Sequence, residues 1–207
     1  LGTAKVHYLK DKLKVVANCH KQPSSTFENR ILNAEEVEKI LSSACILLDK
    51  MHDNIKICFT VSPVRHTKEG MTTNLLSKST LICAVHNLIT KHPDLNLSYF
   101  PAYEMMMDEL RDYKYYNEKD LIHPSELAVD IIFDRFAETY LSVDSQALSS
   151  DIMQIKRDCD HRLTFHKSEA AQKHLRAIEN KILKVTRKNP SLDFSQEREY
   201  IRSMTIV

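Results

Sequence analysis

A chain of 207 residues, 43% of them hydrophobic, can bury one sizeable core but is too short for two full domains. Its formal net charge of +1, with basic residues spread among acidic ones, argues against nucleic acid or an anionic membrane as a partner. No segment has the roughly 20 apolar residues of a membrane span, and five dispersed Cys favour mostly buried free thiols in a reducing compartment, so we expect a cytoplasmic protein.

The first residues favour an incomplete domain. The chain begins with "LGTAKVHY", which has no initiator Met and is typical of the end of an apolar strand. Gly2 and Gly70 are its only glycines, although an α/β domain normally uses Gly at strand-to-helix turns. We therefore expect an N-terminally truncated domain, part of which lies upstream.

Short apolar segments predict the strands of this domain. Residues 4–9 and 13–18 flank the polar "KDK" and are typical of a hairpin or a paired edge. Residues 55–61 are apolar on both faces, as in a strand that helices cover on each side of a parallel sheet. Residues 96–100 are a further strand candidate.

Helical patterns lie between these strands. Asn33 has Glu at the third following position, which is a capping-box pattern and predicts a helix over about 34–52. An apolar stripe from Leu81 to Ile89 predicts a second helix that ends before Pro93. The alternation of strands and helices predicts an α/β fold with right-handed βαβ units and a parallel sheet.

The second half of the chain is mainly helical. Residues 103–113 predict a short helix, and Pro124 suits the first position of another helix, which carries an apolar stripe to Tyr140. We place a domain boundary after it, with the α/β domain at 1–143 and a helical extension at 144–207. The stripe of the extension is close to a heptad repeat and consists of Ala171, Leu175, Ile178, Ile182 and Val185. It packs either on the domain or on a partner chain, so a homo-oligomer is one expectation.

Three polar loops follow predicted strands or helices and hold the candidate site residues. They are 62–66, 101–104 and the loop that contains Asp120 and His123. Because binding groups gather at the carboxyl ends of strands in open α/β sheets, we expect the loops to converge. This hypothesis predicts Arg65 or His66 within reach of His123.

Asp120 and His123 have the spacing of an orienting carboxylate and a general base. In that interpretation the carboxylate selects the tautomer of the imidazole, and the ring removes the proton of a nucleophile. The alternative is a helix cap or a surface pair, which the spacing alone favours because the D-x-x-H pattern is common.

The other polar residues also have two interpretations. Arg65 could bind an anionic or acylated substrate with its fork of donors, or could pair with a nearby carboxylate in its loop. Glu104 belongs to an acidic helical face that is usually solvated, although its position beside Tyr103 favours burial.

No cofactor is expected, since the chain has no Gly-rich phosphate loop. No metal is expected either. Cys19 with His20, and Cys159 with His161 and His166, lack the spacing of common chelating motifs.

Several motifs together are more specific than any one of them. In this order, and across essentially the whole length, they resemble the GSCFA family, which is similar to the SGNH (GDSL-like) hydrolases. The motifs are "LGTAKVHY", "VVANCHKQP", "FTVSPVRHTKEG", "NLLSKSTLICAV", "YFPAYEMMMDELRDYKYYNEKDLIHPSELAVDIIF", "HRLTFHKSEAAQKHL" and "NPSLDFS".

The resemblance implies a three-layer α/β/α domain whose D-x-x-H block is Asp120 and His123. In such hydrolases His is the general base, Asp orients it, and a Ser near the N-terminus attacks an ester or acyl carbonyl. The Gly-Ser-Cys-Phe-Ala motif does not occur in the sequence, so we expect the nucleophile to lie upstream and this chain alone to be inactive.

The oxyanion hole of SGNH enzymes usually uses a G-x-N-D motif. Here Gly2 is followed by Thr3, with Ala4 where the Asn would fall, so either Asn18 substitutes from the neighbouring turn or the oxyanion hole is built differently. The resemblance also assigns Arg65, His66 and Glu104 to the substrate side, because they belong to the shared motifs.

The leading function is therefore part of an SGNH-like serine hydrolase that acts on an ester or acyl group, for example on an acylated glycan. The alternative is a noncatalytic binding or assembly module on the same fold, which the absent Ser favours. A third option, a metal-dependent hydrolase, predicts bound zinc, which we do not expect.

Overall fold

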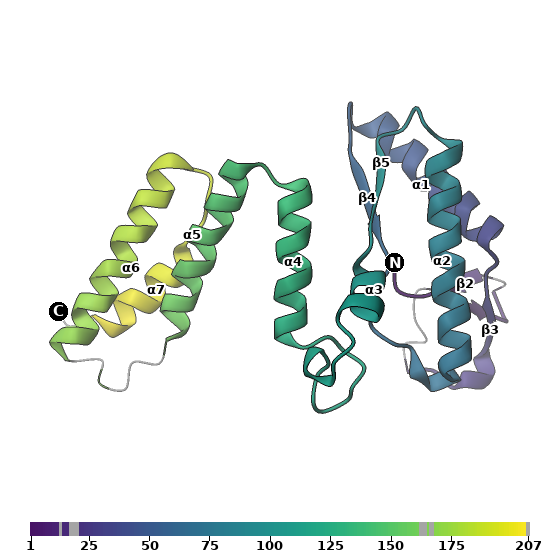
Figure 1. The fold of residues 1–207 in the computed structure, drawn as a ribbon, viewed down its shortest axis with the longest axis horizontal. Coiled ribbons are helices and arrows are strands. Elements are labelled where there is room, and N and C mark those ends of the chain that lie inside the picture. Colours follow the sequence, from purple (N-terminus) through teal and green to yellow (C-terminus); the bar gives the residue numbers. More distant parts are fainter. Residues whose placement is uncertain (13, 17–20, 162–164, 166–167, 206–207) are drawn as a thin grey trace. The chain divides into compact units, whose positions relative to one another are not determined.

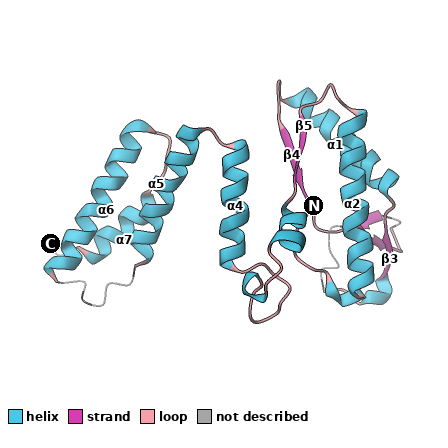
Figure 2. Ribbon diagram, in the orientation of Figure 1, coloured by secondary structure: helices cyan, strands magenta, loops and turns pink. Residues whose placement is uncertain are grey.

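The structure is a computed structural model and describes residues 1–12, 14–16, 21–161, 165 and 168–205. The chain divides into two compact units, unit 1 from Leu1 to Asp134 and unit 2 from Arg135 to Val207. Figure 1 traces the chain through both, and Figure 2 shows that helices predominate over strands.

Unit 1 begins with a three-stranded antiparallel sheet. Its strands are β1 (Lys5–Leu9), β2 (Lys14–Val16) and β3 (Phe27–Ile31), in the order β2-β1-β3. Central His7 lies opposite Val16 on one side and Asn29 on the other. The predicted hairpin is confirmed. We missed β3, which follows a short 3-10 turn, η1 (Ser24–Thr26), because its sequence "FENRI" has polar and exposed central residues.

Helix α1 (Ala34–Met51) confirms the prediction of a helix over about 34–52. The Asn33 side chain accepts the backbone N–H of Glu36 at 2.9 Å, and the Glu36 carboxylate accepts the N–H of Asn33 at 2.9 Å. This capping box satisfies two N–H groups that the helix itself leaves unpaired.

Two parallel strands form the second sheet. β4 (Ile57–Thr60) and β5 (Leu97–Phe100) pair with Ile57 opposite Leu97, and α2 (Met71–Lys91) connects them after a 3-10 turn, η2 (Thr67–Glu69). The predicted βαβ unit is therefore confirmed. Helix α2 begins at Met71, ten residues before the apolar stripe that starts at Leu81. Its first turns are rich in polar residues, so the stripe did not predict them.

The predicted three-layer α/β/α parallel sheet is not what the structure shows. The described part of the chain is a mixed α/β fold with two small sheets, one antiparallel and one parallel. Cys58 of β4 is exposed, so helices do not cover both faces of that strand. Cys83 is exposed too, while Cys45 is buried, and the expectation of mostly buried thiols is wrong for these two.

Helices α1 and α2 pack against each other over the first core of unit 1. This core also contains residues just before β1 and just after β3 and β4. Its buried members are Ala4, Leu32, Val37, Val61, Leu81 and Ala84.

The chain after β5 folds into short turns before the next long helix. α3 (Ala102–Glu104) continues as the π-helical segment η3 (Met105–Glu109), and a 3-10 turn, η4 (Tyr113–Tyr115), precedes α4 (Glu126–Tyr140). The predicted helix over 103–113 thus ends early. A second core contains Met106, Leu110, Tyr116 and Ala128, so the segment turns back to bury Leu110 and Tyr116.

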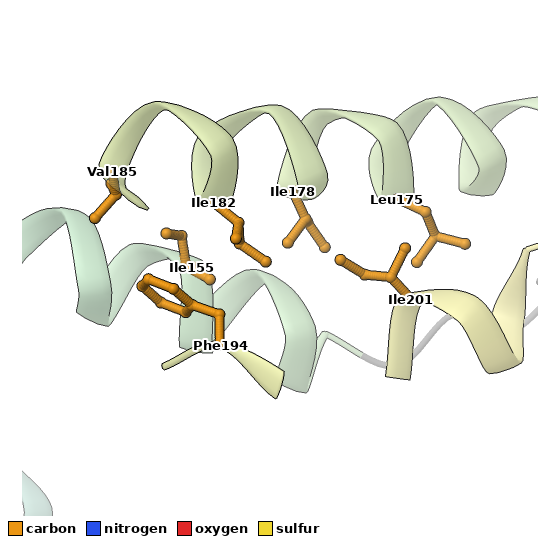
Figure 3. Close-up of a cluster of buried hydrophobic side chains, with 7 residues drawn as sticks. All are labelled: Ile155, Leu175, Ile178, Ile182, Val185, Phe194 and Ile201. Carbon is orange, nitrogen blue, oxygen red and sulfur yellow. The ribbon is translucent and has the colours of Figure 1, made fainter. Parts of the chain in front are cut away.

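Unit 2 contains the helices α5 (Val143–Asp160), α6 (Glu169–Lys188) and α7 (Ser195–Met204). The heptad-like stripe of α6 is buried. Figure 3 shows most of it facing three side chains: Ile155 of α5, Phe194 just before α7, and Ile201 of α7. These positions are thus occupied within the unit, and an oligomer through the stripe has no support. None of the described helices is long and apolar enough to cross a membrane.

Candidate active site

Asp120 and His123 form a hydrogen-bonded pair within one short loop of unit 1. Asp120 Oδ2 lies 2.8 Å from His123 Nδ1, and Asp120 Oδ1 accepts the backbone N–H groups of Ile122 at 2.8 Å and His123 at 3.0 Å. The backbone N–H of His123, that of Ile122 and the imidazole together lower the pKa of Asp120 to about 2. The carboxylate is therefore ionised and fixed in place at neutral pH.

Backbone contacts hold this loop. Leu121 has a φ of 53°, and the carbonyl of His123 accepts the N–H of Asn117 at 2.8 Å. Helix α4 starts after Pro124, and Ser125 Oγ accepts the N–H of Ala128 at 3.3 Å, so Ser125 rather than Asp120 or His123 caps it. The pair is available for another role.

The second nitrogen of His123 is accessible. The side chain of His123 is 58% exposed and that of Asp120 is 36% exposed. Within the described part of the chain, His123 Nε2 has no hydrogen-bond partner. Since Nδ1 faces the carboxylate, Nε2 is the atom able to accept a proton from a ligand.

Arg65 packs against the same loop. Its Nη2 donates to the Tyr116 hydroxyl at 2.8 Å, its guanidinium lies 4.5 Å from the centre of that ring, and Nη1 is 3.4 Å from the carbonyl oxygen of Leu121. Leu121 stands between Asp120 and His123. The loops 62–66 and 120–123 therefore meet through Arg65, which binds a hydroxyl, a ring and a carbonyl.

His66 lies beside Gly2. A Cβ atom placed on Gly2 would be 3.8 Å from His66 Nε2. Partial burial, and secondarily the positive charge of Lys78, lower the pKa of His66 and favour its neutral form. The structure thus brings together Gly2 and His66, two of the predicted site residues. Asn18 lies outside the described residues.

Glu104 binds a tyrosine. The hydroxyl of Tyr99 donates to the Glu104 carboxylate, at 2.9 Å from Oε1 and 3.0 Å from Oε2. Burial and this hydrogen bond raise the pKa of Tyr99. Glu104 is partly buried, and this contact links α3 to β5.

A polar stripe at the start of α2 was missed in the sequence. Asn74 Oδ1 accepts the backbone N–H of His66 at 2.8 Å, and Ser77 Oγ accepts that of Ala4 at 2.7 Å. Lys78 Nζ donates to the carbonyl oxygens of Gly2 at 2.6 Å and Ser62 at 2.7 Å. Burial lowers the pKa of Lys78 to about 8.

These three residues fasten the segments 2–4 and 62–66 to one helix. The detectable signal was their i, i+3, i+4 spacing in "NLLSKST", which places all three on one helical face.

Metal ligands do not gather in the described part of the chain. No group of three His, Cys, Asp or Glu side chains there could hold a metal ion. The sequence candidates Cys19, His20 and His166 lie outside the described residues.

Comparison with known proteins identifies one family over most of the chain. The model of the GSCFA family matches residues 1–136. The model of the GSCFA domain protein, C-terminal domain, matches residues 152–206. The chain matches no curated protein and no solved structure.

These matches correct the expectation that the chain lacks the N-terminal region of the family. The prediction of a fragment lacking the N-terminal region of the family is wrong, because the family model matches from residue 1. The scarcity of Gly was a poor guide, since Lys21, Asn54 and Leu121 adopt positive φ where Gly is more usual.

Proposed function

Since the chain belongs to the GSCFA family, we propose that it is an SGNH-like hydrolase of an ester or acyl group. His123 is the general base and Asp120 the carboxylate that orients it. The observation that carries this proposal is the 2.8 Å contact between Asp120 and His123 Nδ1, with Nε2 left accessible.

The proposed reaction uses the two ring nitrogens for different tasks. As an attacking hydroxyl oxygen forms its bond to the substrate carbonyl carbon, Nε2 removes the proton of that hydroxyl. The carbonyl π electrons move to its oxygen, which becomes negative, and Asp120 stabilises the imidazolium. When the carbonyl re-forms, the bond to the leaving alcohol breaks and Nε2 returns the proton to that alcohol.

The attacking hydroxyl belongs to a serine in SGNH enzymes. In the part of the chain that the structure describes, no serine is hydrogen-bonded to His123 Nε2. A fluorophosphonate that labels one serine, located by peptide mass spectrometry, would identify the nucleophile.

The remaining site residues keep the roles that the family resemblance implies. Arg65 supports the proposal by holding the loop of Asp120 and His123 through the carbonyl of Leu121. The assignments of Gly2 and Asn18 to the oxyanion hole, and of His66 and Glu104 to the substrate side, stay predictions. An acylated glycan is one substrate class to include in the assay.

The test is hydrolysis of a panel of short acyl esters and acetylated glycans by the purified chain. His123→Ala is expected to lower kcat roughly 100- to 10,000-fold, because it removes the general base. Asp120→Asn should lower kcat as well, since the wrong tautomer of the imidazole is then favoured.

The matched control is His52→Ala, which removes another exposed histidine of unit 1 and should leave kcat within twofold. Hydrolysis that is unchanged by His123→Ala would contradict the assigned base. No hydrolysis of any ester by a folded wild-type chain would favour the noncatalytic binding or assembly module.

A further inference from the structure

Lys78 is a buried cation held by backbone carbonyls. Its side chain is only 1% exposed, and the described residues include no carboxylate paired with it. Its ammonium group donates to the carbonyl oxygens of Gly2 and Ser62, at 2.6 and 2.7 Å. Buried lysines are rare without a carboxylate partner, which indicates a specific role for Lys78.

The contact with Gly2 orients the next peptide group. The described backbone has no cis peptide bonds, so the carbonyl of Gly2 and the N–H of Thr3 point in opposite directions. With the carbonyl directed at the buried ammonium, the Thr3 N–H points away from Lys78. Gly2 and Thr3 are both exposed.

Neighbouring backbone groups are used in other contacts. Ala4 donates its N–H to Ser77 Oγ at 2.7 Å, and the carbonyl of Leu1 accepts the N–H of Ser62 at 2.8 Å. The Thr3 N–H has no acceptor among the residues that the structure describes. It is a fixed and unused donor at the end of a segment that α2 holds in place.

Lys78 also changes the strength of this donor. A positive charge on a carbonyl oxygen draws electron density through the peptide group, so the N–H at its other end becomes a better donor. The segment 62–66 connects this peptide to the loop of the proposed base. At one end, the carbonyl of Ser62 accepts a hydrogen bond from the same ammonium group as the carbonyl of Gly2. At the other end, Arg65 donates to the carbonyl of Leu121, two residues before His123.

We propose that Lys78 is a positioning residue for oxyanion stabilisation. It fixes and polarises the peptide between Gly2 and Thr3, and the Thr3 N–H donates to the oxygen that becomes negative when the substrate carbonyl is attacked. This role rests on the proposed hydrolase function. Lys78 acts through the peptide and does not touch the substrate.

The test uses two uncharged variants in the ester assay. Lys78→Met removes both the charge and the donors, and should lower kcat at least about tenfold with KM within twofold, because the lost interaction forms only in the transition state. Lys78→Gln keeps two N–H donors for the same carbonyls. It should retain at least three times the kcat of Lys78→Met while staying at least threefold below the wild type.

Lys91→Met is the matched control, since it removes a lysine of the same helix whose partner is the Glu38 carboxylate. It should leave kcat within twofold. Hydrogen exchange of the amides of Ser62, Val64 and His66 separates a local effect from unfolding. Faster exchange is expected there in Lys78→Met, with α1 unchanged.

The outcomes separate this inference from the hydrolase proposal. If His123→Ala abolishes hydrolysis but folded Lys78→Met keeps kcat within twofold, only the role of Lys78 fails. If wild-type hydrolysis is absent or independent of His123, both proposals fail. Should Lys78→Met not fold, Lys78→Gln decides, and a kcat within twofold of the wild type overturns the role.

Discussion

At the residue scale, one carboxylate organises the candidate site. Asp120 accepts three N–H donors from residues that follow it within one turn of chain. The left-handed conformation of Leu121 allows this turn, and Arg65 contacts its carbonyl from a distant segment. Contacts within residues 120–123 therefore set the geometry of the pair, whereas the contact that supports the loop comes from Arg65, which is distant in the sequence.

The lowered pKa of Asp120 predicts a pH-dependent contribution to stability. The folded-state pKa is about 2 against an ordinary value of 3.8, so the contribution is present above pH 4 and is lost as pH falls through about 2. Asp120→Asn should lower the free energy of unfolding at pH 7, and the difference from the wild type should shrink between pH 4 and pH 2. Urea denaturation at several pH values measures it.

Asp53→Asn is the control, since Asp53 is exposed and makes no hydrogen bond within the described residues. Its difference from the wild type should stay small throughout. A difference for Asp120→Asn that is as large at pH 2 as at pH 7 would contradict the electrostatic origin.

At the scale of single elements, helices α1 and α2 of unit 1 differ in how they begin. Helix α1 has a local capping box, which the Arg30 guanidinium reinforces by binding both oxygens of Glu36 at 2.9 and 2.8 Å. Helix α2 starts at Met71 after Gly70, with no side-chain cap. Its first turns instead bind the segments 2–4 and 62–66 through the polar stripe.

The capping box gives a prediction for α1. Asn33→Ala should lower the free energy of unfolding by about 1 kcal/mol, because the N–H of Glu36 loses its acceptor. Urea denaturation at pH 7 measures the change. Asn96→Ala, at an exposed Asn before β5, should change it by less than about 0.5 kcal/mol. Equal effects of both variants would contradict the capping role.

At the scale of the whole molecule, each buried cluster is drawn from a single unit. The clusters around Val61 and Met106 belong to unit 1, and the cluster around Ile182 belongs to unit 2. The second family model, over 152–206, falls within unit 2. The helical tail therefore has its own core.

This organisation predicts a local response to a cavity in unit 2. Ile182 is fully buried, so Ile182→Ala should destabilise unit 2 by about 2–5 kcal/mol. Hydrogen exchange should accelerate in α5, α6 and α7, with α1 and α2 as the internal reference. Leu183→Ala is the matched control, because the adjacent Leu183 is 49% exposed. Equal acceleration in α1 and α2 would contradict separate cores.

Periodicity and capping in the sequence were enough to predict much of the local structure. They predicted the strands around "KDK", helix α1, the parallel pair of β4 and β5, and the buried stripe of α6. The D-x-x-H spacing indicated Asp120 and His123 as a pair, but by itself it favoured a helix cap or a surface pair, and only the family resemblance favoured a general base. The sequence did not predict strand β3, because its central residues are polar and its strand conformation depends on pairing with β1.

The sequence by itself determined the features whose interacting groups lie within a few residues of each other. They are the capping box of α1, the apolar stripes, and the Asp120–His123 pair. Only the tertiary structure decided that the described residues form two small sheets, that the α6 stripe packs against α5, Phe194 and α7, and that Lys78 joins Gly2 to Ser62. The physical reason is range. Caps and periodic faces act within a turn or two of helix, whereas the partner of a buried cation is chosen by chain segments that meet only after folding.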